Sequence, residues 1–181
     1  MAYSNETGYP SVTDILEPYV DTKWFRPIHK KRGSEAHRVV GCKLNNSWAA
    51  PINPAWQGYV DTIMRWCDAN IKEVVQVETR YQDDLYRFTG KLDLVALLLD
   101  GRLALIDFKT AVAESRTWKL QTGGYKLLYE KHNPDKTIDV RICVRGREDG
   151  SKKALVNEYT DHVTDQNRFL YANDLYHTLK L

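Results

Sequence analysis

Two apolar segments joined by a short turn stand in the middle of the sequence, GKLDLVALLLDGRLALIDFKT (residues 90–110). The continuous apolar run 94–99 predicts a strand that is covered on both faces and therefore lies inside a sheet. Asp100-Gly101 is typical of a hairpin turn, and residues 102–110 return as a second apolar strand. The sequence thus predicts an antiparallel pair of buried strands at the centre of the fold.

The length of the turn sets which residues of the two strands face each other. A two-residue loop would pair Leu94 with Asp107 and direct Asp93 to the opposite face of the sheet. A three-residue loop, with Gly101 in the left-handed conformation, would instead place Asp93 directly opposite Asp107, with β-carbons about 5 Å apart. We predict the three-residue loop.

Asp93, Asp107 and Lys109 are charged residues within these apolar strands. Alternation along a strand places Asp107 and Lys109 on one face. Two carboxylates this close would repel each other in a dry site unless a cation lay between them. Mg²⁺ or Mn²⁺ prefers such ligands and could polarise a phosphate and activate water, while Lys109 held that water or neutralised developing charge. A buried ion pair between Lys109 and one aspartate explains the spacing equally well.

The rest of the sequence alternates between helical and strand patterns without repeats or linkers. Helices are predicted for residues 10–16, from near Ser34, and for 54–71, 115–131 and 165–181. Strands are predicted for 74–81, 86–99, 102–110, 138–145 and 153–159. In the last helix the residues expected to face inward are Phe169, Leu170, Leu175 and Leu179. This order indicates an α/β fold with a central mixed β-sheet flanked by helices.

Length and composition are typical of one soluble globular domain. The 181 residues are 43% hydrophobic and 28% charged, and no apolar run reaches the roughly 18 residues of a membrane span. We expect a single domain, 1–181, with an N-terminal helical part at about 10–72, a sheet and helix at about 73–131, and C-terminal strands and a helix at about 137–181. The N-terminus lacks the blocks of a signal peptide, so a cytoplasmic location is expected.

The cysteines and the basic residues narrow the possible cofactors and ligands. Cys42, Cys67 and Cys143 are scattered and odd in number, which argues against a disulfide framework and against a zinc or iron–sulfur site. We expect all three to be buried thiols. The net charge of +2 is uninformative, but residues 23–38 form a basic run. Such a run is more often a solvated surface than a phosphate contact.

Several short motifs occur together in a fixed order. They are Pro10-Ser11-Val12-Thr13-Asp14-Ile15-Leu16, Trp24, Gly33-Ser34-Glu35-Ala36-His37, Gly90-Lys91-Leu92-Asp93, Ile106-Asp107-Phe108-Lys109-Thr110, and Gln121 with Tyr125. This set resembles the core of the PD-(D/E)XK nucleases, in particular the RecB-type exonuclease branch, which includes the mitochondrial genome maintenance exonuclease and the CRISPR-associated adaptation nuclease. The resemblance runs from about residue 10 to residue 125 and implies a restriction-endonuclease-like core.

The resemblance implies a set of metal ligands for Mg²⁺ or Mn²⁺. Asp93 and Asp107 would bind the metal together with the backbone carbonyl of Phe108. His37 would supply an imidazole to the same metal or to a second one, so the number of metals stays open. Glu78 matches an acidic position on the first strand of this branch, and it is a secondary candidate that either aids the site or pairs with a basic residue.

The resemblance also implies the residues that act on the substrate. Lys109 would be the catalytic lysine. Gln121 and Tyr125 are four residues apart and share a helix face, from which Gln121 would orient Lys109 or the scissile phosphate, and Tyr125 would contact the phosphate or the Gln121 amide. Gly123 and Gly124 are unfavourable in a helix by about 1 kcal/mol each. Close approach of nucleic acid or of a strand would explain them, and so would tight packing.

Contacts to the DNA backbone and bases are expected around this centre. Lys31 and Arg32 belong to the basic run and would contact phosphates. Trp24, Trp118 and Tyr125 could stack on exposed bases.

The sequence also departs from some relatives of this branch. It has no counterparts of the four cysteines that hold an iron–sulfur cluster in some of them, so no cluster is expected. No phosphate-binding motif of a helicase occurs. Any unwinding would therefore come from a separate helicase or recombination protein. The size fits a phage enzyme acting in the host cytoplasm.

These features predict a metal-dependent DNA nuclease. We expect a stand-alone exonuclease that acts on single strands or duplex ends in recombination, repair or replication. The alternative enzyme is a structure-specific or restriction-like endonuclease. A catalytically inactive nucleic-acid-binding module of the same fold would show damage to the metal-binding residues, whereas all of them are present. A plain α/β interaction domain would carry these charges for structural reasons and would gain no stability from a cation.

Overall fold

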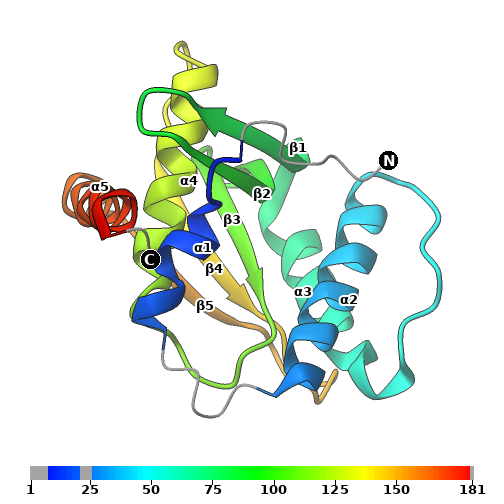
Figure 1. Ribbon diagram of the computed structural model, residues 1–181. Helices are drawn as coiled ribbons and strands as arrows, with labels where there is room; N and C mark the ends of the chain where they lie inside the picture. The colour runs from blue at the N-terminus through cyan, green and yellow to red at the C-terminus, as the bar shows by residue number, and fades with distance from the viewer. Residues whose placement is uncertain (1–7, 21–25, 180–181) are drawn as a thin grey trace.

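The computed structural model describes residues 8–20 and 26–179 (Figure 1). Its helices are α1 (Val12–Leu16), α2 (Pro27–Leu44), α3 (Gln57–Asn70), α4 (Trp118–His132) and α5 (His162–Leu179), with short 3-10 turns at Glu17–Tyr19 and Pro54–Trp56. Its strands are β1 (Ile71–Asp83), β2 (Phe88–Leu98), β3 (Leu103–Lys109), β4 (Val140–Arg145) and β5 (Leu155–Tyr159). Trp24 lies outside the described residues. Among the described residues, no helix is both long and apolar enough to cross a membrane.

The five strands form one mixed sheet in the order β1-β2-β3-β4-β5. All neighbours are antiparallel except β3 and β4, which are parallel and are joined through α4. Helices α2 and α3 cover one face of the sheet, and α1, α4 and α5 cover the other (Figure 1). The predicted order of elements and the predicted α/β fold with a flanked mixed sheet are confirmed.

The predicted register of the central hairpin is also confirmed. Leu97 lies opposite Leu103 and Leu94 lies opposite Ile106, which is the pairing that a three-residue loop produces. Gly101 has a φ of 89°, in the region that favours glycine. Asp93 and Asp107 are the next residues along the two strands, directly beyond the last paired residues of the ladder.

Helix α2 begins earlier than predicted. It starts at Pro27 rather than near Ser34, because proline is well suited to the first position of a helix. The basic residues that follow, including Lys31 and Arg32, are therefore helical. The packing of α2 against the sheet therefore determines which way each of these basic side chains points.

The predicted orientation of α5 is wrong in its last two turns. Phe169 is fully buried as expected, but Leu175 and Leu179 are 45% and 59% exposed. Apolar residues occur all around this helix, and its inward face is set by Phe169, Ala172 and Asn173. Asn173 is buried because its side chain donates to the Tyr86 carbonyl at 2.9 Å, so a polar residue takes part of the inward face.

The cysteine prediction is also corrected at one position. Cys67 and Cys143 are buried free thiols, as expected. Cys42 is only half buried, because it lies in the last turns of α2, where the helix approaches an exposed loop.

The glycines of α4 are explained by tight helix packing. A β-carbon at position 124 would lie 2.9 Å from the Phe169 ring, and one at position 123 would lie 3.2 Å from the Asp165 backbone. Beneath this contact Arg141 is fully buried and pairs with Asp165 at 2.7 Å. The same guanidinium donates to the Lys119 carbonyl at 2.7 Å, so β4, α4 and α5 are joined at one point.

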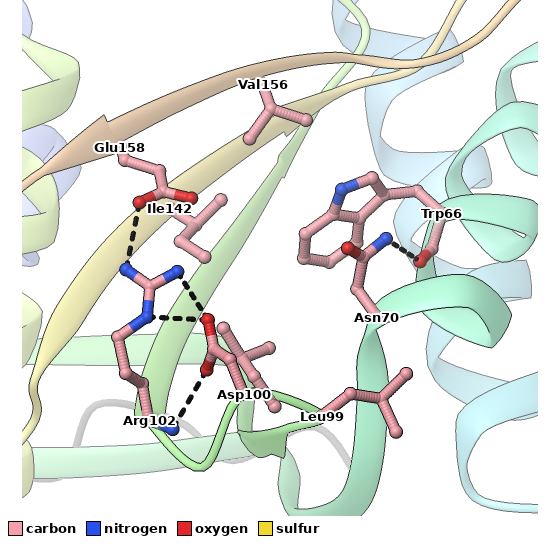
Figure 2. A pocket seen from close by; sticks show the side chains of 9 residues that line it. Trp66, Asn70, Leu99, Asp100, Arg102, Ile142, Val156 and Glu158 are labelled. Atoms are coloured by element: carbon pink, nitrogen blue, oxygen red, sulfur yellow. Dashed lines mark hydrogen bonds and ion pairs between the residues drawn. The ribbon is translucent and has the colours of Figure 1, made fainter.

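A pocket of about 170 Å³ lies between α3 and the β2–β3 turn (Figure 2). Trp66 forms one wall, and Arg102 on the other side donates to Glu158 at 3.0 Å and to Asp100 at 2.8 Å. This pocket is at the turn end of β2 and β3, whereas Asp93 lies in the middle of β2 and Asp107 lies near the far end of β3. The candidate active site is therefore located by its chemistry rather than by this cavity.

We predict opposite outcomes for two glycines inside helices. Gly33→Ala should raise the free energy of unfolding by about 0.5–1 kcal/mol, because its methyl group meets only Thr110 Oγ1 at 3.6 Å and the unfolded chain loses freedom. Gly124→Ala should lower it by about 1–3 kcal/mol, because the methyl group collides with Phe169. Denaturant unfolding followed by circular dichroism measures both changes. A rise for both variants would contradict the packing of α4 on α5.

Candidate active site

Three carboxylates stand in a row across neighbouring strands. The pairing of β1 with β2 places Glu78 level with Asp93, and the pairing of β2 with β3 places Asp93 level with Asp107. Asp93 and Asp107 are only 8% and 3% exposed. Buried carboxylates are costly unless they are paired or bind a cation, so this row requires positive charge around it.

The two aspartates are held by different partners. One oxygen of Asp93 lies 3.1 Å from His37 Nδ1, and the other accepts a hydrogen bond of 2.8 Å from the Phe108 backbone N–H. Asp107 Oδ2 lies 2.6 Å from Lys109 Nζ. The predicted ion pair between Lys109 and one aspartate is thus present, and His37 from α2 reaches the same site.

Glu78 adds a third acid from a strained position. Its φ of 52° is uncommon for a residue other than glycine and costs about 1–3 kcal/mol. The carboxylate forms an ion pair with Lys91, and its side chain packs where a β-carbon at Gly41 would stand, 2.9 Å from Glu78 Cγ. Strain of this kind collects at functional sites. Of the two roles that the sequence left open for Glu78, the structure shows the pairing with a basic residue. Glu78 also lies near Asp93, and its aid to the site stays a prediction.

The charges of this site influence one another's protonation. Burial alone would lower the pKa of His37, but the Asp93 carboxylate outweighs it and raises that pKa to about 8. Burial acts to raise the pKa of Asp93, yet His37 holds it below its ordinary value. Burial also acts to lower the pKa of Lys109, and Asp107 more than restores it. When no metal is bound, these interactions favour the charged forms of His37, Asp93 and Lys109, and a cation that bound His37 would displace its proton.

A hydrogen-bonded chain from α4 fixes the lysine. Lys109 Nζ donates to Gln121 Oε1 at 2.8 Å, and Gln121 Nε2 donates to the Tyr125 hydroxyl at 3.0 Å. The structure therefore shows the predicted contact of Gln121 with Lys109 and the predicted contact of Tyr125 with the Gln121 amide. The alternative contacts of both residues with a phosphate stay predictions. Gly90 is required beneath this chain, because a β-carbon there would lie 3.0 Å from the Tyr125 ring.

The aromatic residues of the site are less accessible than expected. Trp118 and Tyr125 are each only 6% exposed, so neither ring can stack on a base without moving. Instead the ring centroid of Trp118 lies 5.6 Å from Lys109 Nζ and 5.8 Å from the Arg145 guanidinium carbon. Trp118 thus serves in the structure as a packing surface for two cations.

The two predicted phosphate contacts on α2 differ in their surroundings. Arg32 donates to the Thr110 carbonyl at 2.8 Å and lies over the Tyr59 ring at 4.7 Å. It is therefore anchored beside the residue that follows Lys109. Lys31 is exposed on the surface of the helix. The structure brings Arg32 to the edge of the site and leaves Lys31 outside it.

The most compact group of possible metal ligands consists of His37, Glu78 and Asp93. Within the part of the chain that the structure describes, one ligand atom of each lies within 4.8 Å of the others. Nitrogen and oxygen donors of this kind suit Mn²⁺ and, for the carboxylates, Mg²⁺. The predicted ligand set of His37, Asp93, Asp107 and Phe108 stays a prediction. In the structure Glu78 joins His37 and Asp93 in the compact group, while Lys109 pairs with the Asp107 carboxylate.

Sequence reasoning missed three residues next to this row. Lys91 pairs with Glu78, Cys143 lies with its sulfur 3.7 Å from Asp107 Oδ2, and Arg145 stands beside Lys109 in the sheet. Lys91 lies within the Gly-x-x-Asp motif and could have been found from the β1–β2 register. The other two belong to β4, whose parallel register is set across the α4 connection and has no local signal.

The fold agrees with comparisons to known proteins. A protein of Eubacterium rectale that has been proposed to be an exonuclease has a solved structure similar to this one, with a TM-score of 0.61 and 10% identity over 99% of this chain and 85% of that one. The solved structure of SSO0001 is also similar, with a TM-score of 0.53 and 12% identity over 99% of this chain and 79% of that one. No curated protein matches the chain by sequence.

The family is shown by the sequence itself. The family model of the PD-(D/E)XK nuclease superfamily matches residues 10–173. The chain therefore belongs to the PD-(D/E)XK nuclease superfamily. Its substrate class is nucleic acid, and nucleases of this superfamily use divalent metals.

We predict that a divalent cation stabilises the protein through the carboxylate row. Mn²⁺ at about 100 times its dissociation constant should add about 2.7 kcal/mol to the free energy of unfolding. Asp93→Asn should abolish the rise in melting temperature, and Glu78→Gln should reduce it. Glu73→Gln, which changes an exposed acid on the same strand, is the matched control and should keep the full rise. Differential scanning calorimetry with Mn²⁺ and with EDTA measures the shift, and equal shifts in all four proteins would place the cation elsewhere.

Proposed function

We propose that the protein is a metal-dependent nuclease that hydrolyses DNA phosphodiester bonds, with Lys109 as its catalytic lysine. The observation that carries this proposal is the position of Lys109 between Asp107 and Gln121, beside the His37–Asp93 pair. A lysine held this firmly next to buried carboxylates is suited to act on a charged substrate rather than only to neutralise an acid.

Mg²⁺ or Mn²⁺ would be held by Asp93 and Asp107, with His37, Glu78 and the Phe108 carbonyl completing the set. The Phe108 N–H is directed at Asp93, and a strand residue directs its N–H and C=O to the same side. The Phe108 carbonyl therefore also points toward β2 and the row. A cation bound there would polarise the phosphate and lower the pKa of a water molecule.

Lys109 has one donor left for the reaction. An ammonium group carries three N–H donors, and two of these are taken by Asp107 and Gln121. The third is available to hold the attacking water or to neutralise charge that develops on the phosphate. Asp107 raises the pKa of Lys109, which keeps the group protonated for this role. Gln121 is itself fixed by Tyr125, so the direction of the third donor is set by α4.

Action on DNA ends is proposed from the RecB-type motifs. These motifs are the ordered set of His37, Asp93, Ile106-Asp107-Phe108-Lys109-Thr110 and Gln121 with Tyr125. The exonuclease activity proposed for the similar protein of Eubacterium rectale supports the same assignment. We propose a single nuclease domain without an iron–sulfur cluster that works in the cytoplasm on single strands or duplex ends. A separate helicase or recombination protein would supply the opened DNA in recombination, repair or replication.

We predict that cleavage requires both the cation and the lysine. Labelled single-stranded and duplex DNA should be degraded with Mg²⁺ or Mn²⁺ and should stay intact with EDTA. Lys109→Ala should lower the rate at least about 100-fold, the scale seen when a positioned transition-state contact is removed. Lys136→Ala, at an exposed lysine beyond the end of α4, should cleave at the wild-type rate. Gel analysis of the labelled products measures the cleavage rates. Equal rates for wild type and Lys109→Ala would contradict the catalytic role of Lys109.

We further predict that the enzyme needs a DNA end. Linear single strands should be degraded while covalently closed circles of the same sequence stay intact, because an exonuclease enters only at a terminus. Comparison of 5′- and 3′-labelled strands then gives the direction of digestion. Cleavage of circles at a rate close to that of linear strands would identify an endonuclease instead, with the same catalytic residues.

A further inference from the structure

Arg145 is a second cation beside the catalytic lysine. Strands β3 and β4 are parallel, and Arg145 is the residue of β4 paired with Lys109. Paired residues of neighbouring strands project from the same face of a sheet, with backbones about 4.8 Å apart. The two side chains share one packing surface, since both charged groups lie within 6 Å of the Trp118 ring centroid, at 5.6 and 5.8 Å.

The charge of Arg145 is not balanced by a carboxylate. Within the described residues, its guanidinium makes one hydrogen bond, from Nη1 to the Val112 carbonyl at 3.0 Å, and its Nε is buried without a partner. No ion pair involves it among those residues, although Lys109 beside it has Asp107. A partly buried cation without a counter-ion is costly, so an anion from outside the protein would satisfy it.

Two other arginines, Arg141 and Arg102, are neutralised by carboxylates within the protein, whereas Arg32 at the edge of the site also lacks an ion pair among the described residues and has a buried Nε without a partner there. Arg141 pairs with Asp165 at 2.7 Å, and Arg102 pairs with Asp100 and Glu158. In the loop between β3 and α4, Glu114 is the acidic residue that could have formed an ion pair with Arg145. Its carboxylate is instead taken by Asn157 and by the Tyr159 hydroxyl, each at 2.7 Å.

The loop that follows Lys109 therefore holds Arg145 in a fixed position. Arg145 binds the Val112 carbonyl, Arg32 binds the Thr110 carbonyl at 2.8 Å, and Glu114 fixes the far side of the loop on β5. The guanidinium is anchored through Nη1, and Nη2 makes no hydrogen bond within the part of the chain that the structure describes. A planar group of donors held in this way is suited to a phosphate oxygen.

We propose that Arg145 binds the backbone phosphate that neighbours the scissile phosphate at Lys109. The proposal rests on the proposed nuclease function and adds to it a residue that positions the strand. Lys109 on β3 contacts the scissile phosphate. Arg145, on the neighbouring strand β4, contacts the next phosphate of the same nucleic-acid strand. Arg145 thereby sets the register of the nucleic acid relative to the row of carboxylates.

The first test is the salt dependence of binding in EDTA, where cleavage is prevented. The probe is a fluorescently labelled oligothymidylate, and its affinity is measured by anisotropy over a range of salt concentrations. Each phosphate contact contributes about 0.7 to the slope of log K against log salt for a single strand. Arg145→Gln should lower the slope by about that amount, and Arg145→Lys should keep most of it. Arg65→Gln is the matched control, since Arg65 also donates to backbone carbonyls, at 3.2 and 2.6 Å, and lies on α3 away from Lys109.

The second test locates the phosphate. A set of oligonucleotides carries one neutral methylphosphonate at each linkage in turn. Loss of one charge-assisted contact should weaken wild-type binding about tenfold at the linkage that Arg145 meets. The same substitution should have no further effect on Arg145→Gln, while the other linkages behave alike in both proteins. Circular dichroism and melting temperature confirm that each variant is folded.

The outcomes separate this proposal from the proposed function. An unchanged salt slope, or a methylphosphonate profile that is the same for wild type and Arg145→Gln, overturns the phosphate contact even if wild type cleaves DNA. A changed slope with a single linkage lost supports it even if the wild-type protein shows no cleavage. A fall in cleavage rate with unchanged binding would overturn it too, because Arg145 would then act only by holding the loop at Val112.

Discussion

The row of carboxylates across β1, β2 and β3 is the constraint on which the rest of this structure depends. Asp93 and Asp107 are buried next to each other, and the partly buried Glu78 lies level with Asp93 on the neighbouring strand. Such an arrangement is unstable unless cations surround it. The sequence supplies them from several elements, with His37 on α2 and Lys109 on β3. The positive charges stabilise the buried carboxylates. Together with the carboxylates, they also provide groups that could bind a metal ion and a phosphate.

The site lies where both helical layers contact the first three strands of the sheet. From one layer α2 brings His37 to Asp93, and from the other layer α4 brings Gln121 to Lys109 (Figure 1). Close packing is needed for this convergence, and it is provided by glycines at the contacts of β2 with α4 and of α2 with β1. Gly41 lowers the helix propensity of α2 but lets the helix approach β1, and Gly90 lets α4 approach β2.

The sequence predicted what is specified locally. The register of β2 and β3 follows from the Asp100-Gly101 turn, because a short loop leaves few ways to pair the strands. Features that depend on distant parts of the chain were missed: Arg145 acquires its position from a parallel pairing across α4, and the strain at Glu78 has no counterpart in composition or spacing. The inward face expected for α5 was wrong at Leu175 because packing on α4, rather than amphipathicity, orients that helix.

The irregular backbone of β1 has a consequence for the behaviour of the protein at high concentration. At 13 residues β1 is the longest of the described strands, and it forms an edge of the sheet. A long, flat edge is a template on which another chain can add a strand and begin aggregation. Register shifts near Glu73 and Gln76 and the left-handed Glu78 interrupt that edge. The distortion that presents an acid to the site therefore also protects the free edge from intermolecular strand pairing.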